Sequence, residues 1–168
     1  TYRELGLRES SDQIAAAEAL PKQFSYIDGE RIAIFGWSFG GYNTLMSLCR
    51  GKVFRAGVAV APVTDWRFYD TVYTERFMAT PQVNNKGYEA SSVLSIAHNL
   101  HGDLLVIHGT ADDNVHLQNT MRLATELVKA DIPFEMATYT DKDHSIYGGN
   151  NRQHLYSRII EFLDRKLK

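Results

Sequence analysis

The residues best suited to chemistry lie in the segment Gly-Trp-Ser-Phe-Gly-Gly at positions 36–41, which matches the pattern G-x-S-x-G. In this pattern the serine occupies a sharp turn between a strand and a helix, where a bulky neighbour would collide with the backbone. The turn exposes the hydroxyl of Ser38, and the backbone amide of Phe39 at the start of the helix can stabilise a negatively charged oxygen. An apolar run precedes the motif and a helical pattern follows it, so we predict that Ser38 is a nucleophile.

A serine hydroxyl needs a base that accepts its proton and an acid that orients the base. In hydrolases that carry this turn, the partners follow in the order serine, aspartate, histidine, each on a loop after a later strand. One such loop holds Asp112 and Asp113, and a later loop ends in His144. Because the carboxyl ends of parallel strands share one edge of a sheet, we expect both loops to lie close to Ser38.

Among the six histidines, His144 is the best candidate for the base. His108 lies within an apolar run, where a structural role is the simpler interpretation. His98 and His101 are three residues apart, but this pair alone does not predict a metal site. We expect the two remaining histidines to lie on the surface or in helices: His116 and His154.

The pattern does not separate Asp112 from Asp113 as the acid. One of them would orient the histidine, and the other would order the loop or cap the following helix. Asp141 and Asp143 share a loop with His144. We expect these two to be solvated turn residues.

An aromatic cluster follows the second apolar run, within residues 66–78. Phe68 and Phe77 fit a stripe of core residues on a helix. For Trp66, Tyr69 and Tyr73 the pattern leaves two interpretations open. They belong either to the core or to a hydrophobic pocket near the catalytic edge of the sheet, where a small apolar substrate group would bind.

These loops need a scaffold, and the chain alternates helix and strand throughout. Strands are predicted at 31–35, 55–61, 103–108 and 134–139, and helices at 11–23, 40–50, 91–99, 117–130 and 151–168. Apolar strands separated by helices are typical of a parallel sheet covered on both faces. The predicted fold class is therefore α/β, with about four parallel strands and helices on both faces.

Composition narrows the function classes. The chain has 168 residues, of which 44% are hydrophobic and 23% charged, as expected for one globular domain. Twenty acidic and 18 basic side chains give a net charge of −2, which predicts no nucleic-acid partner. One cysteine, Cys49, excludes an internal disulfide. The chain opens on Thr1 rather than methionine, which suggests a fragment or a processed piece.

Four segments resemble the C-terminal catalytic part of the dipeptidyl peptidase IV-like enzymes in the prolyl oligopeptidase family of serine peptidases. They read GWSFGGY, VAPVTDWRFYDTVYTERFM, IHGTADDNVH and YTDKDHSIYG. The likeness covers nearly the whole chain. It implies an α/β-hydrolase fold, a peptide substrate and no cofactor. It also implies that an N-terminal dipeptide with proline or alanine in second place is released through an acyl-enzyme. Bacterial members are often periplasmic, which favours an extracytoplasmic location.

The resemblance also implies individual roles. Ser38 would be the nucleophile, Asp112 the acid and His144 the base, and the backbone amide of Phe39 would bind the oxyanion. Asn114 would bind the carbonyl of the preceding substrate residue. Five residues would line the pocket for the proline or alanine side chain: Val63, Trp66, Tyr69, Tyr73 and Val115.

Fewer than forty residues precede Ser38, whereas an α/β-hydrolase domain places several strands and an oxyanion loop there. We therefore expect residues 1–168 to be a partial catalytic domain without the N-terminal strands and without the propeller domain. In the family these parts supply a tyrosine oxyanion donor and the paired glutamates that hold the substrate amine. The elbow strand at 31–35 would leave a bare edge, so we expect low activity alone and self-association through this edge or the terminal helix.

Two other functions remain open at this point. A related hydrolase of the same family, an acylaminoacyl peptidase or an esterase, would use the same three residues, because fold and triad do not fix the substrate. A non-catalytic relative would use the fold only to bind a partner. Such a relative would be expected to lack a member of the triad.

Overall fold

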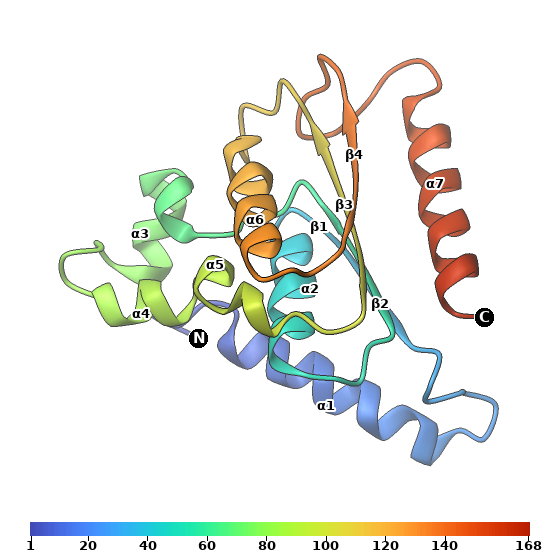
Figure 1. Ribbon diagram of the computed structural model, residues 1–168. Helices are drawn as coiled ribbons and strands as arrows, with labels where there is room; N and C mark the ends of the chain where they lie inside the picture. The colour runs from blue at the N-terminus through green and yellow to red at the C-terminus, as the bar shows by residue number, and fades with distance from the viewer.

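Four short apolar segments form one parallel sheet in the computed structural model, which describes all 168 residues. The strands lie in the order β1-β2-β3-β4, and each pairs with the next in parallel (Figure 1). Their bounds are Ala33–Trp37, Ala56–Val60, Asp103–Gly109 and Glu135–Tyr139. The predicted α/β fold with four parallel strands is confirmed, and β1 and β4 are the two edges of the sheet.

Helices cover both faces of the sheet, as predicted. The helices α2 and α6 lie on one face, with the long helix α1 packed against α2 and the short helices beside them, and α7 lies on the other face (Figure 1). The α-helices are α1 Leu7–Gln23, α2 Phe39–Arg50, α3 Thr71–Met78, α4 Asn85–Ala90, α5 Val93–Ile96, α6 Gln118–Lys129 and α7 Asn151–Lys166, and two 3₁₀ turns are η1 Trp66–Phe68 and η2 Ala97–Asn99. No helix has both the length and the apolar character that a membrane span requires.

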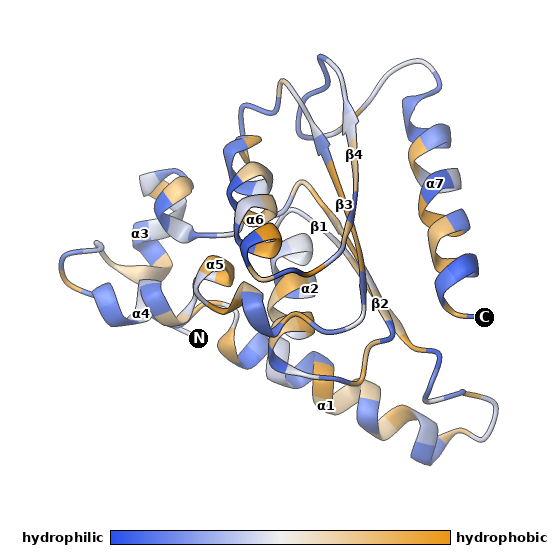
Figure 2. Cartoon of the chain, viewed as in Figure 1, coloured by the Kyte–Doolittle hydropathy of each residue, from blue (hydrophilic) through white to orange (hydrophobic).

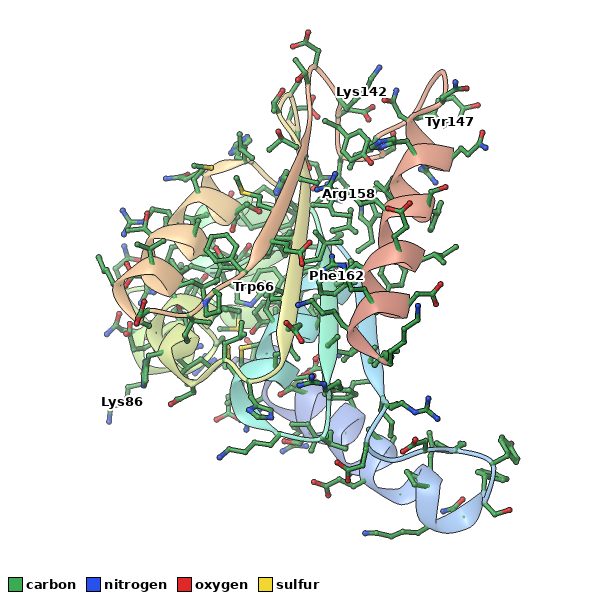
Figure 3. The ribbon with its side chains drawn as sticks, turned by 45° about the vertical axis from the view of Figure 1, so that its right-hand side comes forward. Trp66, Lys86, Lys142, Tyr147, Arg158 and Phe162 are labelled. Atoms are coloured by element: carbon green, nitrogen blue, oxygen red, sulfur yellow. The ribbon has the colours of Figure 1, made fainter.

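The sheet separates two hydrophobic clusters because side chains alternate along a strand. In β2, Val58 and Val60 belong to the cluster under α7, whereas Ala59 belongs to the cluster on the α2 side. Figure 2 shows hydrophobic residues along β2 and a mixture of polar and hydrophobic residues along α7. Trp66 and Phe162, labelled in Figure 3, are large buried side chains of the two different clusters.

Some predicted boundaries are wrong at α1. The helix begins at Leu7 after Gly6, four residues before the predicted start at Ser11. Ser10 lies inside the helix and its hydroxyl donates to the carbonyl of Gly6 at 2.6 Å. The helix continues two residues beyond Pro21, because a proline in the last turn removes only one hydrogen bond.

The helix α3 was not separated from its aromatic surroundings by the sequence pattern. Its start is defined by Asp70, whose carboxylate accepts a hydrogen bond from the backbone amide of Tyr73 at 2.8 Å. Aspartate is preferred at the N-cap, so Asp70 could have indicated the start of this helix from sequence alone. The prediction covered residues 66–78 as one aromatic cluster and did not use this signal.

Candidate active site

Ser38 sits on a strained turn between β1 and α2. Its backbone has φ 59° and ψ −117°, a region that non-glycine residues rarely adopt and that costs about 1–3 kcal/mol. The amide of Ser38 donates to the carbonyl of Val60 at 2.8 Å, which fixes the turn to β2. Gly36 is required where the end of β1 approaches the start of α2, since a Cβ there would lie 2.1 Å from the backbone of Gly40. The local structure thus presents a half-exposed serine at the carboxyl end of the sheet.

Phe39 is the first residue of α2. The first amides of a helix have no acceptor within the helix and carry partial positive charge from the helix dipole. The amide of Phe39 therefore lies beside Ser38 and is free of an intrahelical partner. Its aromatic ring packs against Trp66 at a centroid distance of 5.9 Å.

His144 and Asp112 lie on the loops that follow β4 and β3, and they are hydrogen bonded to each other. The Nδ1 atom of His144 is 2.8 Å from Oδ2 of Asp112. An ionised carboxylate only accepts, so Nδ1 carries the proton and Nε2 is left with a free lone pair. The Asp112 side chain is completely buried, whereas the His144 side chain is 23% exposed. This arrangement leaves a histidine that can accept a proton from the solvent side.

The structure distinguishes the four aspartates of the two loops. Asp112 contacts the imidazole, whereas Asp113 is exposed. Asp141 and Asp143 are also exposed, and Asp143 accepts hydrogen bonds from the amide and the hydroxyl of Ser145. The expectation that these last two are solvated turn residues agrees with their exposure.

Asp112 is held in its ionised form by four donors. Its Oδ1 accepts from the backbone amides of Asn114 at 3.0 Å and Val115 at 2.9 Å, and Oδ2 faces His144 and, at 3.3 Å, Nε2 of His108. Burial raises the pKa of the carboxyl, but the hydrogen bonds from His108, His144 and the Asn114 amide outweigh it. The pKa of Asp112 therefore lies well below its ordinary value, and the carboxylate is charged at neutral pH.

A contact that the sequence did not predict connects the serine turn to the histidine loop. The indole Nε1 of Trp37 donates to the carbonyl of His144 at 2.9 Å. Arg152 of α7 lies over the Trp37 ring at 5.1 Å, and its Nε donates to the carbonyl of Ser145 at 2.9 Å. The loop they hold runs between Lys142 and Tyr147, beside α7 in Figure 3. No sequence pattern identifies such a long-range contact.

Ser38 itself makes no direct hydrogen bond to His144 in this structure. Catalytic hydrogen bonds often tighten only when substrate is bound. The structure therefore joins two of the three candidate residues directly and the third through its neighbour Trp37.

Three aromatic side chains form a box beside the serine turn. Trp66 stacks on Tyr73 at 5.9 Å, and Tyr69 meets both rings edge-on at 6.0 Å and 5.3 Å. Trp66 is fully buried, whereas Tyr69 is half-buried and Tyr73 is 36% exposed. The box thus combines a core residue with two tyrosines that reach the surface.

The other residues that the resemblance assigned to substrate binding fall into two groups. Val63 and Val115 are buried. Asn114 is exposed, and its Oδ1 accepts a hydrogen bond from the Tyr69 hydroxyl at 2.7 Å. This bond directs the amide nitrogen of Asn114 away from Tyr69, where it is able to donate to a ligand.

A cavity of about 750 Å³ lies on the outer side of this group and is lined in part by Phe68, Tyr69 and Asn114. Phe68 is half-buried there, so the prediction that it belongs to the core is wrong. The 3₁₀ turn η1 directs it to this cavity. Phe77 does pack against the core cluster, as predicted. Neither Ser38 nor His144 lines the cavity, and Tyr69 is the one residue that it shares with the aromatic box.

Other reactive groups do not form a second centre of the same kind. No group of three or more histidine, cysteine, aspartate or glutamate side chains is placed to hold a metal ion. Cys49 is buried in α2, and burial raises the pKa of its thiol to about 12. It is therefore a poor nucleophile.

Comparison with known proteins agrees with the family resemblance of the sequence. The sequence profile of the prolyl oligopeptidase family matches residues 1–168. The chain belongs to this family. The family membership inferred from the four motifs is thereby confirmed.

Individual members are similar over almost the whole chain. The "Crystal structure of Porphyromonas gingivalis dipeptidyl peptidase 4" superposes with a TM-score of 0.97 at 62% identity, covering 99% of this chain and 24% of that one. A "Probable dipeptidyl-aminopeptidase B" of Grosmannia clavigera is 49% identical, over 95% of this chain and 17% of its own length. "Dipeptidyl peptidase 4" of Felis catus is 48% identical, over 96% of this chain and 21% of its own length. The chain thus spans about a fifth of the length of these relatives.

Proposed function

We propose that this family member is the catalytic region of a serine dipeptidyl peptidase that releases N-terminal dipeptides with proline or alanine in second place. The observation that carries the proposal is the 2.8 Å hydrogen bond between Asp112 and His144, at the edge of the sheet where the strained turn exposes Ser38. The names of similar proteins, dipeptidyl peptidase 4 and dipeptidyl-aminopeptidase B, support the reaction class.

In the proposed mechanism, Nε2 of His144 accepts the proton of the Ser38 hydroxyl while Oγ attacks the carbonyl carbon of the scissile peptide bond. The amide of Phe39 donates to the oxyanion that forms. His144 then gives the proton to the leaving amine, and the dipeptide stays on Ser38 as an ester. Water attacks this ester in the second half, again with His144 as base. Asp112 keeps the imidazole in the required tautomer throughout.

The substrate pocket in this proposal is the aromatic box. A proline or alanine side chain would pack against Trp66, Tyr69 and Tyr73, with Val63 and Val115 behind them. The amide nitrogen of Asn114 would donate to the carbonyl of the preceding residue. The hydrogen bond from Tyr69 supports this role because it directs that nitrogen outward.

We further propose that residues 1–168 are a partial catalytic domain. The strand β1 is an edge of the sheet and Phe35 on it is 47% exposed, which supports a neighbouring strand from elsewhere in a longer protein. That longer protein would also supply the second oxyanion donor and the glutamates for the substrate amine. Without them, residues 1–168 alone would turn over substrate poorly, since losing one oxyanion donor costs about 10²–10³ in rate.

The bare β1 edge and the α7 surface also support self-association of residues 1–168. Tyr156 and Ile160 on α7 are 43% and 58% exposed. Self-association is measured by light scattering of residues 1–168 over a range of concentrations, which gives the molecular mass. A mass that rises with concentration is expected, and a constant monomer mass would refute it.

The reaction is tested with the full-length protein and three substrate types. We expect release of p-nitroaniline from glycyl-prolyl-p-nitroanilide, and loss of that activity in a Ser38→Ala variant. Preference for an N-acylated amino acid anilide would instead indicate an acylaminoacyl peptidase, and preference for a simple ester would indicate an esterase. Binding without turnover of any of the three would indicate an interaction module.

A further inference from the structure

His108 is a buried histidine that the proposed mechanism does not use. It lies near the end of β3, and its side chain has no exposed surface. Its Nδ1 is 2.7 Å from the hydroxyl of Thr120 in α6. Its Nε2 is 2.8 Å from the carbonyl of Val115 and 3.3 Å from Oδ2 of Asp112. Both ring nitrogens of His108 therefore have hydrogen-bond partners, although the residue lies in an apolar strand.

These partners determine where the proton of His108 lies. The carbonyl of Val115 and the carboxylate of Asp112 can only accept hydrogen bonds, so Nε2 must carry the proton. A neutral imidazole has one donor and one acceptor, and Nδ1 is then the acceptor of the Thr120 hydroxyl proton. Thr120 therefore selects the tautomer whose Nε2–H donates to the Val115 carbonyl at 2.8 Å and also lies 3.3 Å from Oδ2 of Asp112.

We propose that His108 is a positioning residue for the catalytic triad: its Nε2–H, oriented by Thr120, holds the Asp112 oxygen that also accepts the hydrogen bond of His144. This inference rests on the proposed function. Two imidazoles converge on Oδ2, whereas two backbone amides hold Oδ1. The carboxylate is thereby prevented from rotating, and its remaining lone pair, on Oδ2, stays directed at His144.

The second donor also moderates the charge that His144 experiences. A hydrogen bond to a carboxylate draws charge away from it, and His108 contributes to holding the pKa of Asp112 low against the effect of burial. Without His108, Asp112 would attract the protonated form of His144 more strongly. The pH at which the base becomes inactive should then move upward.

Two other titratable groups act on Asp112, and neither interferes with this measurement. Burial raises the pKa of Tyr69, and a hydrogen bond from Ser145 lowers the pKa of Asp143. Both groups therefore keep their charge state across the neutral range. A shift of the acid limb between variants then reports on the histidine–aspartate pair.

The test uses the full-length protein with His108→Leu, His108→Gln and Thr120→Val, and with His98→Leu as a matched control at an exposed histidine. The pH dependence of kcat and KM is measured on glycyl-prolyl-p-nitroanilide. Leucine removes the donor, whereas the amide of glutamine can offer an N–H near the position of Nε2. Valine keeps the shape of threonine without its hydroxyl.

We expect His108→Leu to lower kcat about ten- to a hundredfold with KM nearly unchanged, because a hydrogen bond to a charged group is lost. The acid limb of the profile should move to higher pH. His108→Gln should restore most of the rate, Thr120→Val should give a smaller loss, and His98→Leu should behave as the wild type.

Several results would overturn the inference. One is a set of His108 variants that melt at lower temperature but retain kcat and the acid limb when assayed below their transition. Another is a glutamine variant as impaired as the leucine variant. If His108→Leu does not fold, the same criteria are applied to His108→Gln and Thr120→Val. An inactive wild-type protein would instead refute the proposed function itself.

Discussion

The indole nitrogen of Trp37 lies 2.9 Å from the backbone carbonyl oxygen of His144 and donates a hydrogen bond to it. Trp37 directly precedes Ser38, and the two partners are 107 positions apart in the sequence. The bond therefore joins the turn that carries the proposed nucleophile to the loop that carries the proposed base. It fixes the distance between two elements whose side chains would meet in the proposed reaction.

Replacing Trp37 with phenylalanine should loosen this connection. The substitution removes the N–H while keeping an aromatic ring under Arg152. A neutral hydrogen bond contributes about 1 kcal/mol, so we expect kcat to fall about fivefold with a small change in KM. Steady-state kinetics on the full-length protein measure this, and an unchanged kcat would show that the loop is positioned by other contacts.

Gly36 and Gly40 provide a matched pair in the serine turn. A Cβ on Gly36 would lie 2.1 Å from the backbone of Gly40, whereas a Cβ on Gly40 would meet nothing within 4 Å. We expect Gly36→Ala to lose about 3 kcal/mol of stability through overpacking, and Gly40→Ala to be neutral or up to about 1 kcal/mol more stable because alanine favours the helix. Thermal unfolding of both variants measures the difference. Equal melting temperatures would contradict the tight turn.

Asp112 determines one feature of the pH dependence. Its pKa is held below the ordinary value, so the carboxylate is charged throughout the neutral range. The acid side of the kcat/KM profile should therefore report one proton, taken up by His144. A profile that loses activity with the uptake of two protons above about pH 4, the ordinary range of an aspartate, would contradict this.

The same lowered pKa makes a contribution to stability. A carboxyl whose pKa is lower in the folded state stabilises the fold fully above its unfolded value of about 3.9, and loses this effect as the pH falls toward the folded value. Asp112→Asn lacks this titration. Its melting temperature should therefore fall less steeply than that of the wild type between about pH 4 and pH 2. Parallel curves would show that other groups dominate acid unfolding.

The Tyr69 hydroxyl should affect binding more than chemistry. It holds the side-chain oxygen of Asn114 at 2.7 Å and so orients an amide that is proposed to contact the substrate. With Tyr69→Phe, we expect KM to rise about fivefold while kcat changes less, as for loss of one hydrogen bond. An equal fall in kcat without a change in KM would place this pair in the transition state instead.

Much of the fold was predictable because its signals are local. Each strand is an apolar run between turn residues, and the four predicted strands are observed with shifts of one or two residues. The start of α1 was missed because Gly6 precedes the helix without a capping side chain, which leaves no N-cap signal in the sequence. The position of Phe68 depends on a 3₁₀ turn of three residues, which leaves no periodic signal.

The site was predictable in its residue types but not in its connections. The motif around Ser38 and the order of the later loops pointed to Asp112 or Asp113 and to His144, and the structure places Asp112 against the histidine. The contacts of Trp37 and His108 depend on three-dimensional packing between segments with no common pattern. A histidine in an apolar strand gave no indication that its partner would be the candidate acid.

A fluorophosphonate probe tests whether Ser38, His144 and Asp112 act together, because the probe reacts only with a serine that a base has activated. The measurement compares the full-length protein with Ser38→Ala and Asp112→Asn. We expect rapid labelling of the wild type, none of Ser38→Ala, and labelling slowed by about 10⁴ in Asp112→Asn because the imidazole loses its tautomer. Labelling of Ser38→Ala, or a folded wild-type protein that does not react, would contradict the triad.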